Sequence, residues 1–255
     1  MDMYDRLSTY EYAYYLQFLP WGINPAGKEC LVIGLGAGLV PSWYEARGVR
    51  VDIVDIDPDV VEIAKRYFGF AVSGDIFIED ARYHLNTSSK RYDYVILDVF
   101  NGDTTPGHIL SREALLVLKE RMTEQGILSI NLIGSLQHKN FMTASIIRTL
   151  GSVFPAVDVY PNYDVERHKG AGNITVLASR SPLKPFDLRS VAAFPVNSFA
   201  ASEVNRFLGQ RYRLPEGTPA IILTDDYNPI DFYDVWLKEW LRKNILENND
   251  MDVLI

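Results

Sequence analysis

One stretch, residues 29–57, constrains the fold of this chain more than any other; its sequence is ECLVIGLGAGLVPSWYEARGVRVDIVDID. The apolar run from Cys30 to Ile33 lacks alternation, which predicts a strand buried on both faces. The residues from Leu39 to Arg47 predict a helix, and the run from Val51 to Val54 predicts a second strand. Two buried strands joined by a helix indicate a parallel pair within an α/β sheet.

Three glycines, Gly34, Gly36 and Gly38, link the first predicted strand to the helix. They permit a tight turn and a close approach of the backbone to a ligand. Asp55 stands at the carboxyl end of the second strand, where an acid can accept hydrogen bonds from ribose hydroxyls. Leu39 occupies the last position of a G-x-G-x-x-G pattern, which disfavours a dinucleotide and favours an adenosyl sulfonium donor. The alternative is a turn that only lets helix and strand pack.

Acidic residues also follow the next two predicted strands. The strand from Ile76 to Ile78 precedes Asp80, and the strand from Tyr94 to Leu97 precedes Asp98. Predicted helices separate the strands, and this alternation is typical of a doubly wound parallel sheet. Because ligands of open α/β sheets bind beyond the carboxyl ends of the strands, we expect Asp55, Asp80 and Asp98 to share one ligand site.

The last strands are predicted to depart from the parallel arrangement. Gly126 to Leu132 is the fifth predicted strand, and Val157 to Tyr160 and Asn173 to Ala178 follow it. Too few residues join the last two for a crossover helix, so we expect them to pair antiparallel. The predicted fold is therefore α/β, a doubly wound, seven-stranded, methyltransferase-like (Rossmann-like) sheet that ends in an antiparallel hairpin.

The composition divides the chain into three parts. We predict an aromatic N-terminal segment with a linker from Pro20 in residues 1–27, a donor-binding catalytic domain in 28–180, and an extension in 181–255. The extension contains the acidic run LTDDYNPIDFYD and a predicted final helix from Val235 to Leu246. Asp225 in this run belongs either to a solvated, capped turn or to a segment that closes a pocket.

Composition and charge narrow the classes of function. Of 255 residues, 47% are hydrophobic and 23% charged, as in a globular protein, and no apolar run is long enough to span a bilayer. The net charge of −8 argues against nucleic acid as a partner and suits a cationic substrate. Cys30 is the single cysteine and the histidines lack metal-ligand spacing, so we expect a cytoplasmic protein without a metal or membrane insertion.

Several motifs, taken in order, resemble the spermidine synthase family of polyamine aminopropyltransferases. They are Tyr12 followed by Pro20, then Asn24-Pro25, LVIGLGAG, VDIDPDVVEIAKRYF, EDARYHL and YDYVILD. The loop DVFNGDTTPGHIL and the late TDDYNP are similar to a divergent branch whose members are often fused to membrane segments. The resemblance implies an enzyme, often a homodimer, that transfers an aminopropyl group from decarboxylated S-adenosylmethionine to an amine and releases methylthioadenosine.

The resemblance also implies roles for matching residues. The three glycines would approach the donor, Asp55 would hold its ribose, and Asp80 would lie near its adenine amino group. Asp98 would orient and deprotonate the attacking amine, which must be neutral to react. Tyr12 would help to place that amine.

Some positions differ from the family pattern. Ala37 stands where the family has an acid at the donor's amino end, and Asn101 stands where a second gate acid is expected, although Asp103 lies two residues further on. A methyltransferase that uses intact S-adenosylmethionine on a small amine or other acceptor is therefore the alternative. A non-catalytic, nucleoside-binding scaffold is a second alternative.

Further residues are candidates for contact with a small cationic amine. Aromatic faces can hold a cation, and loop residues near Asp98 can contact the acceptor. These candidates are Asn101, Asp103, His108, Tyr10, Trp21 and Asp225.

Overall fold

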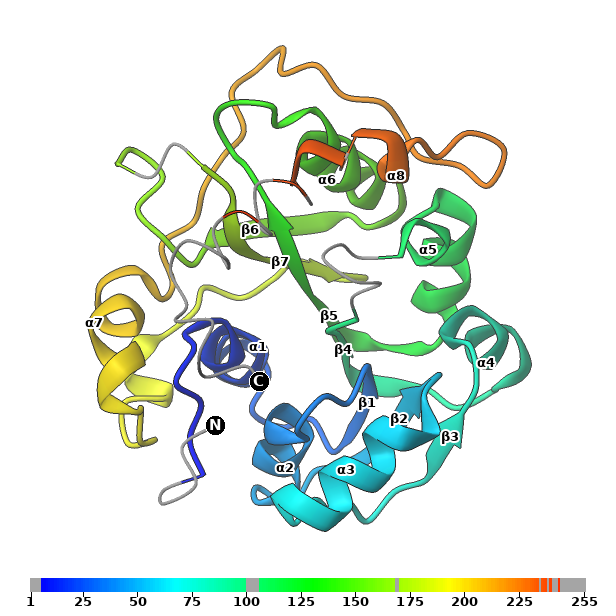
Figure 1. The fold of residues 1–255 in the computed structure, drawn as a ribbon, viewed down its shortest axis with the longest axis vertical. Helices are drawn as coiled ribbons and strands as arrows, with labels where there is room; N and C mark the ends of the chain where they lie inside the picture. Colours follow the sequence, from blue (N-terminus) through cyan, green and yellow to red (C-terminus); the bar gives the residue numbers. More distant parts are fainter. Residues whose placement is uncertain are drawn as a thin grey trace.

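A seven-stranded sheet with the order β3-β2-β1-β4-β5-β7-β6 forms the centre of the molecule (Figure 1). This is seen in a computed structural model that describes residues 6–99, 106–167, 170–233, 235–237, 239 and 243. The strands are β1 (Glu29–Ile33), β2 (Arg50–Asp55), β3 (Ile76–Ile78), β4 (Tyr92–Leu97), β5 (Met122–Gly134), β6 (Ala156–Pro161) and β7 (Gly172–Ser179). Strands β1 to β5 pair parallel, whereas β7 is antiparallel to both β5 and β6. The predicted α/β sheet with a C-terminal antiparallel hairpin is confirmed.

Helices cover both faces of this sheet (Figure 1). They are α1 (Tyr12–Ile23), α2 (Leu39–Glu45), α3 (Pro58–Phe68), α4 (Ala81–Thr87), α5 (Arg112–Glu120), α6 (Phe141–Val153), α7 (Ser198–Phe207) and α8 (Ile230–Tyr233), with 3-10 turns η1 (Gly107–Ile109) and η2 (Leu188–Ser190). Buried side chains of α1, α2, α3 and α7 pack in clusters on one face, and those of α4, α5 and α6 pack on the other. The central strands are buried on both faces, which explains their uninterrupted apolar runs.

Side chains at the strand tips start the following helices. Asp57 accepts a hydrogen bond from the N–H of Asp59 at 2.9 Å, with Pro58 at the first helical position of α3. Asp80 caps α4 in the same way, because its Oδ1 accepts from the N–H of Tyr83 at 2.9 Å. These caps fix where each chain segment turns away from the edge of the sheet.

Helix α1 includes Pro20 and continues to Ile23, so the prediction that a linker begins at Pro20 is wrong. A proline inside a helix leaves the carbonyl four residues earlier without its usual N–H donor. Here that carbonyl belongs to Leu16, and the buried hydroxyl of Tyr44 donates to it at 2.9 Å. The side chain of α2 therefore replaces the backbone donor that Pro20 lacks. The turn begins at Asn24, whose N–H donates to the carbonyl of Pro20.

The described part of the extension packs on both faces of the sheet. Val204 and Leu208 lie in the cluster that contains Phe18 of α1, whereas Leu223 and Ile230 lie in the cluster on the opposite face. Most of the predicted final helix falls outside the described residues, although residues 235–237 are helical. None of the helices in the described part of the chain has the length and apolar character needed to cross a membrane.

Gly38 and Gly48 give a matched test of the glycine turn, because both have left-handed φ angles, 76° and 72°. A Cβ at Gly38 would lie 2.5 Å from Cδ2 of the buried Phe70, whereas a Cβ at Gly48 would meet no atom within 4 Å. We expect Gly48→Ala to lower the free energy of unfolding by about 1 kcal/mol through backbone strain alone. Gly38→Ala should lower the free energy of unfolding by at least about twice as much, because the added Cβ overpacks the site. Chemical denaturation measures both, and equal losses would contradict a role for Phe70.

Candidate active site

A cavity of about 700 Å³ opens at the carboxyl edge of the parallel strands. Asp55, Asp80 and Asp98 all line it, together with Gly34 and Gly36 of the glycine turn. These acids are distant in sequence, and they meet because β2, β3 and β4 end at the same edge of the sheet. A cavity of this size is typical of a small-molecule site.

The glycine turn forms one wall of the cavity with its backbone. Gly34 has a φ of 89°, and a Cβ on it would lie 2.3 Å from the carbonyl oxygen of Asp98. Gly36 also has a positive φ, 52°, but a Cβ there would meet no atom within 4 Å. Gly38 lies at the start of α2 and packs on Phe70 instead of lining the cavity. The turn thus leaves room for a ligand to approach the main chain.

Asp55 is held in a fixed orientation at the tip of β2. Its Oδ2 accepts from the N–H of Leu35 at 2.8 Å, and its Oδ1 accepts from the N–H of Asp57 at 3.0 Å. Each carboxylate oxygen retains capacity for a second donor, such as a ligand hydroxyl. Ile56 and Val60 supply apolar surface next to it in the cavity wall.

Asp80 connects two walls of the cavity. Its Oδ1 accepts from Tyr83 N–H, and its Oδ2 lies 2.9 Å from Nε2 of His108. Burial raises the pKa of Asp80, but the hydrogen bonds from Tyr83 and His108 outweigh it and lower the pKa below its ordinary value. Asp80 is therefore an ionised acceptor that also anchors η1.

Asp98 is the acid best suited to take up a proton. It is partly buried at the end of β4, and Nδ2 of the buried Asn131 donates to its Oδ1 at 2.9 Å. Burial raises the pKa of Asp98 to about 6, although the hydrogen bond from Asn131 acts in the opposite direction. A general base is most effective when its pKa lies near the working pH.

Tyr12, the first residue of α1, lies near this acid. Burial raises the pKa of its hydroxyl, and the negative charge of Asp98 raises it further. The hydroxyl is therefore protonated at neutral pH and can act as a hydrogen-bond donor beside Asp98.

The three aromatic candidates, Tyr10, Tyr12 and Trp21, lie outside the lining of the cavity. Tyr10 is 64% exposed, and its ring centre lies 6.4 Å from that of Tyr12. Trp21 packs on Trp43 and Phe194, with ring centres 5.7 and 6.5 Å apart, so its ring belongs to the core between α1 and α2. We therefore leave Trp21 out of the acceptor site. Asn101 and Asp103 lie outside the described residues.

Asp225 is connected to the wall of the cavity through Arg82. Its carboxylate pairs with both terminal nitrogens of Arg82, with Nη1 at 2.7 Å from Oδ1. Hydrogen bonds from Arg82 and then from Ser111 lower the pKa of Asp225 to about 2. Because Arg82 also donates to the carbonyl of His108 at 3.2 Å, this pair holds a cavity wall, which favours the pocket-closing interpretation.

Asn131 was not predicted at the site, and Asp231 was predicted only as one acid of the run LTDDYNPIDFYD. Asn131 is a polar residue within the apolar run of β5, and that interruption was a usable signal. Asp231 lines the cavity from α8. It is one of several acids in one run, and no spacing rule distinguishes it from Asp226.

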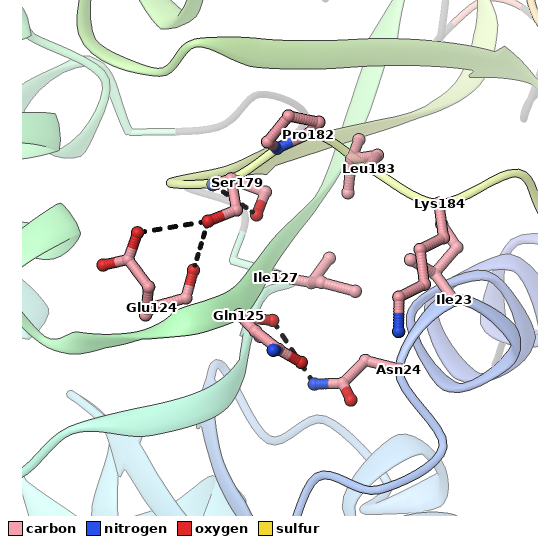
Figure 2. A pocket seen from close by; sticks show the side chains of 10 residues that line it. Ile23, Asn24, Glu124, Gln125, Ile127, Ser179, Pro182, Leu183 and Lys184 are labelled. Atoms are coloured by element: carbon pink, nitrogen blue, oxygen red, sulfur yellow. Dashed lines mark hydrogen bonds between the residues drawn. The ribbon is translucent and has the colours of Figure 1, made fainter.

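A second, smaller cavity of about 190 Å³ shares no lining residue with the first (Figure 2). It lies between the end of α1 and the amino end of β5, where Asn24 Nδ2 donates to the carbonyl of Gln125 at 3.3 Å. Ser181 Oγ donates to the carbonyl and to Oε1 of Glu124 at 3.0 and 3.1 Å, and Lys184 also lines this cavity. This cavity lacks the strand-tip acids, so we assign the active site to the larger one.

Asn131→Ala tests the hydrogen bond to Asp98. The bond favours the ionised carboxylate, so its loss should raise the pKa of Asp98 further above 6. A base at Asp98 would act as the carboxylate, so we expect the acid limb of kcat/KM to move to higher pH by about half a unit or more. Ser129→Ala, on the same strand, is the control, because its buried hydroxyl has no partner among the described residues. An acid limb of kcat/KM at the same pH in Asn131→Ala and the wild type would contradict the effect of Asn131 on the pKa of Asp98.

The amino-acid sequence matches a known family over most of its length. The family model for the spermine/spermidine synthase domain matches residues 11–178. The N-terminal histidine N-methyltransferase of Emericella nidulans is 35% identical over 140 residues, which cover 53% of this chain and 25% of that relative. The polyamine aminopropyltransferase of Vibrio vulnificus is 38% identical over 118 residues, 42% of this chain and 38% of that relative. The match thus spans less than half the length of either relative.

The fold also matches solved structures. A probable spermidine synthase from Corynebacterium glutamicum superposes with a TM-score of 0.71 and 16% identity, covering 88% of this chain and 84% of that one. At this identity the likeness shows the fold alone. The matches together indicate a transferase and divide between aminopropyl and methyl transfer.

Proposed function

Since this chain belongs to the spermine/spermidine synthase domain family, we propose that it transfers an aminopropyl group from decarboxylated S-adenosylmethionine to an amine. The observation that carries the proposal is the cavity in which three strand-tip acids meet beside a glycine turn. Such a cavity offers hydrogen-bond acceptors for a nucleoside and, separately, a general base for a nucleophile. A homodimer and a cytoplasmic location remain predictions.

The donor would lie along the edge of the sheet. Asp55 would accept hydrogen bonds from the ribose hydroxyls, and Asp80 would accept one from the adenine amino group. The backbone at Gly34 and Gly36 would face the sulfonium side chain. The fit is supported by the fixed orientation of Asp55 and by the space that the two glycines leave.

The chemical step needs little electrophilic help, because the sulfonium already activates the adjacent carbon. The lone pair of a neutral amine attacks the propyl carbon bonded to sulfur, and the C–S bond breaks. The electron pair returns to sulfur, which leaves neutral methylthioadenosine. Asp98 would take the proton of the amine, and Tyr12 would orient it by a hydrogen bond, so alignment is the main contribution of the protein.

Methyl transfer from intact S-adenosylmethionine is the alternative. It is favoured by Ala37, which removes an acid that would face the donor's amino end, and by the similarity to an N-methyltransferase. The same Asp98 would serve the acceptor, and the product would be S-adenosylhomocysteine. A nucleoside-binding scaffold without activity is a further alternative.

Identification of the released nucleoside separates these functions. The protein is supplied with both donors and a mixture of di- and polyamines, and mass spectrometry follows the products. Methylthioadenosine is the expected result. S-adenosylhomocysteine would replace the proposal with methyl transfer, and the absence of both nucleosides would favour the scaffold.

Asp55→Ala tests the ribose assignment independently of turnover. Loss of hydrogen bonds from two hydroxyls to a carboxylate should weaken methylthioadenosine binding about tenfold to a hundredfold. Calorimetric titration measures the affinity, with Asp59→Ala on the exposed first turn of α3 as the control. Unchanged affinity of a folded Asp55→Ala variant would remove Asp55 from the donor site.

A further inference from the structure

The second cavity, between the end of α1 and the amino end of β5, has a partly apolar lining (Figure 2). Ile23 and Ile127 are buried members of the core cluster beneath α1, and the partly buried Leu183 packs against that cluster. The volume of about 190 Å³ is larger than that of an engineered apolar cavity of about 150 Å³ that binds benzene. The second cavity therefore has room for one small ring beside these three side chains.

The side chain of Asn24 supplies a hydrogen-bond donor to the same cavity. Its Nδ2 carries two N–H groups, and one of them donates to the carbonyl of Gln125 at 3.3 Å. The backbone of Asn24 is also held, because its N–H donates to the carbonyl of Pro20 at 2.9 Å and its carbonyl accepts from the hydroxyl of the buried Tyr94. The second N–H of this amide is thus a positioned donor for a ligand.

Two of the described lining residues are charged, Glu124 and Lys184, and their charges are compensated differently. Ser181 Oγ donates to Oε1 of Glu124 at 3.1 Å, and Arg180 Nε lies 3.7 Å from its Oε2. Lys184 is exposed, and the described residues include no ion-pair partner for its ammonium group. The lining thus has one unpaired positive charge, which attracts a ligand with a negative charge.

We infer that the second cavity binds a small carboxylate with an apolar body about the size of a benzene ring. The ring packs on Ile23, Ile127 and Leu183, and the carboxylate accepts hydrogen bonds from Lys184 and Asn24. A monoanion fits better than a phosphate dianion, because a second negative charge would have no cation in the lining to pair with. This site shares no described lining residue with the active-site cavity, so the inference goes beyond the proposed function and does not depend on it.

Methyl NMR on the full chain locates and measures this binding. Protein with ¹³C-labelled isoleucine methyl groups is titrated at low ionic strength with benzoate, and separately with benzyl alcohol as an uncharged probe of similar size. We expect benzoate to cause saturable shifts at Ile23 and Ile127 but not at Ile33, which lines the active-site cavity. Lys184→Met should weaken benzoate binding about two- to fivefold, the modest effect of an exposed ion pair, and leave benzyl alcohol binding unchanged. Lys28→Met is the matched control, because Lys28 is exposed directly before β1 and lies outside the lining.

Three results would overturn the inference. The first is the absence of saturable benzoate shifts at Ile23 and Ile127, and the second is equal benzoate affinity in the wild type and Lys184→Met. The third is an equal loss of benzoate affinity in Lys184→Met and Lys28→Met, which would show a general effect of surface charge. None of these measurements depends on which nucleoside the active site releases, so failure of the proposed function is distinguished from failure of this site.

Discussion

Replacement of Asp98 by asparagine should lower turnover by about a thousandfold and leave donor binding nearly unchanged. An amide has almost the same shape as the carboxylate but cannot accept the proton of the attacking amine, and general base catalysis contributes factors of this size. The hydrogen bond from Asn131 can persist, since an amide oxygen also accepts. Steady-state kinetics and calorimetric titration with methylthioadenosine measure the two effects.

Stability provides a further check on Asp98→Asn. Folding raises the pKa of this carboxyl to about 6, so ionisation is less favourable in the folded chain, and the carboxylate destabilises the fold above that pH. The variant should therefore be as stable as the wild type at pH 7, or more stable. Asp59→Asn makes the same change of charge on exposed α3 and should leave turnover unaffected. Full activity of Asp98→Asn would remove this residue from the mechanism.

Lys90→Met should lower the free energy of unfolding by about 2 to 3 kcal/mol. Asp52 is buried on β2, and Lys90 Nζ lies 2.8 Å from its Oδ2 and 2.7 Å from Oε2 of Glu29. Without the ammonium group, a buried carboxylate keeps only the Tyr92 hydroxyl and one backbone N–H as donors. The expected loss is below that of a fully buried pair because the lysine is about one-third exposed.

Measurements at low pH and a second substitution identify the source of the lost stability. Burial raises the pKa of Asp52, but the hydrogen bonds from Lys90 and its other donors outweigh this and lower the pKa. The stabilisation is therefore present at neutral pH and lost as the pH falls through the folded pKa, so the two proteins should converge in acid. Asp52→Asn combined with Lys90→Met should recover part of the stability. Lys65 is exposed on α3, so Lys65→Met should change the free energy of unfolding by less than about 0.5 kcal/mol.

The meeting of the three strand-tip acids could be predicted because it follows from topology. Once the strands before Asp55, Asp80 and Asp98 are recognised as parallel, their ends must meet at one edge. The antiparallel hairpin could be predicted from the short connection before β7. These inferences depend on local patterns and on general rules for connecting strands, and both are properties of the sequence itself.

The rest of the site depends on contacts between residues far apart in the sequence, which no local pattern encodes. Arg82 and Asp225 are separated by 143 positions, and their pairing depends on the path of the whole extension over the sheet. Trp21 was assigned to a pocket on its chemistry alone, but the course of α1 places it among core aromatics. The prediction of a linker from Pro20 is wrong because the hydroxyl that compensates for this proline comes from another helix, at Tyr44.

The family match ends at residue 178, whereas Asp231, which lines the cavity, lies beyond it. The described lining therefore combines residues of the shared domain with a residue from outside it. Substitutions near Asp231 can change this part of the lining without altering the three strand-tip acids. Relatives that agree over the shared domain are therefore free to differ in this part of the cavity.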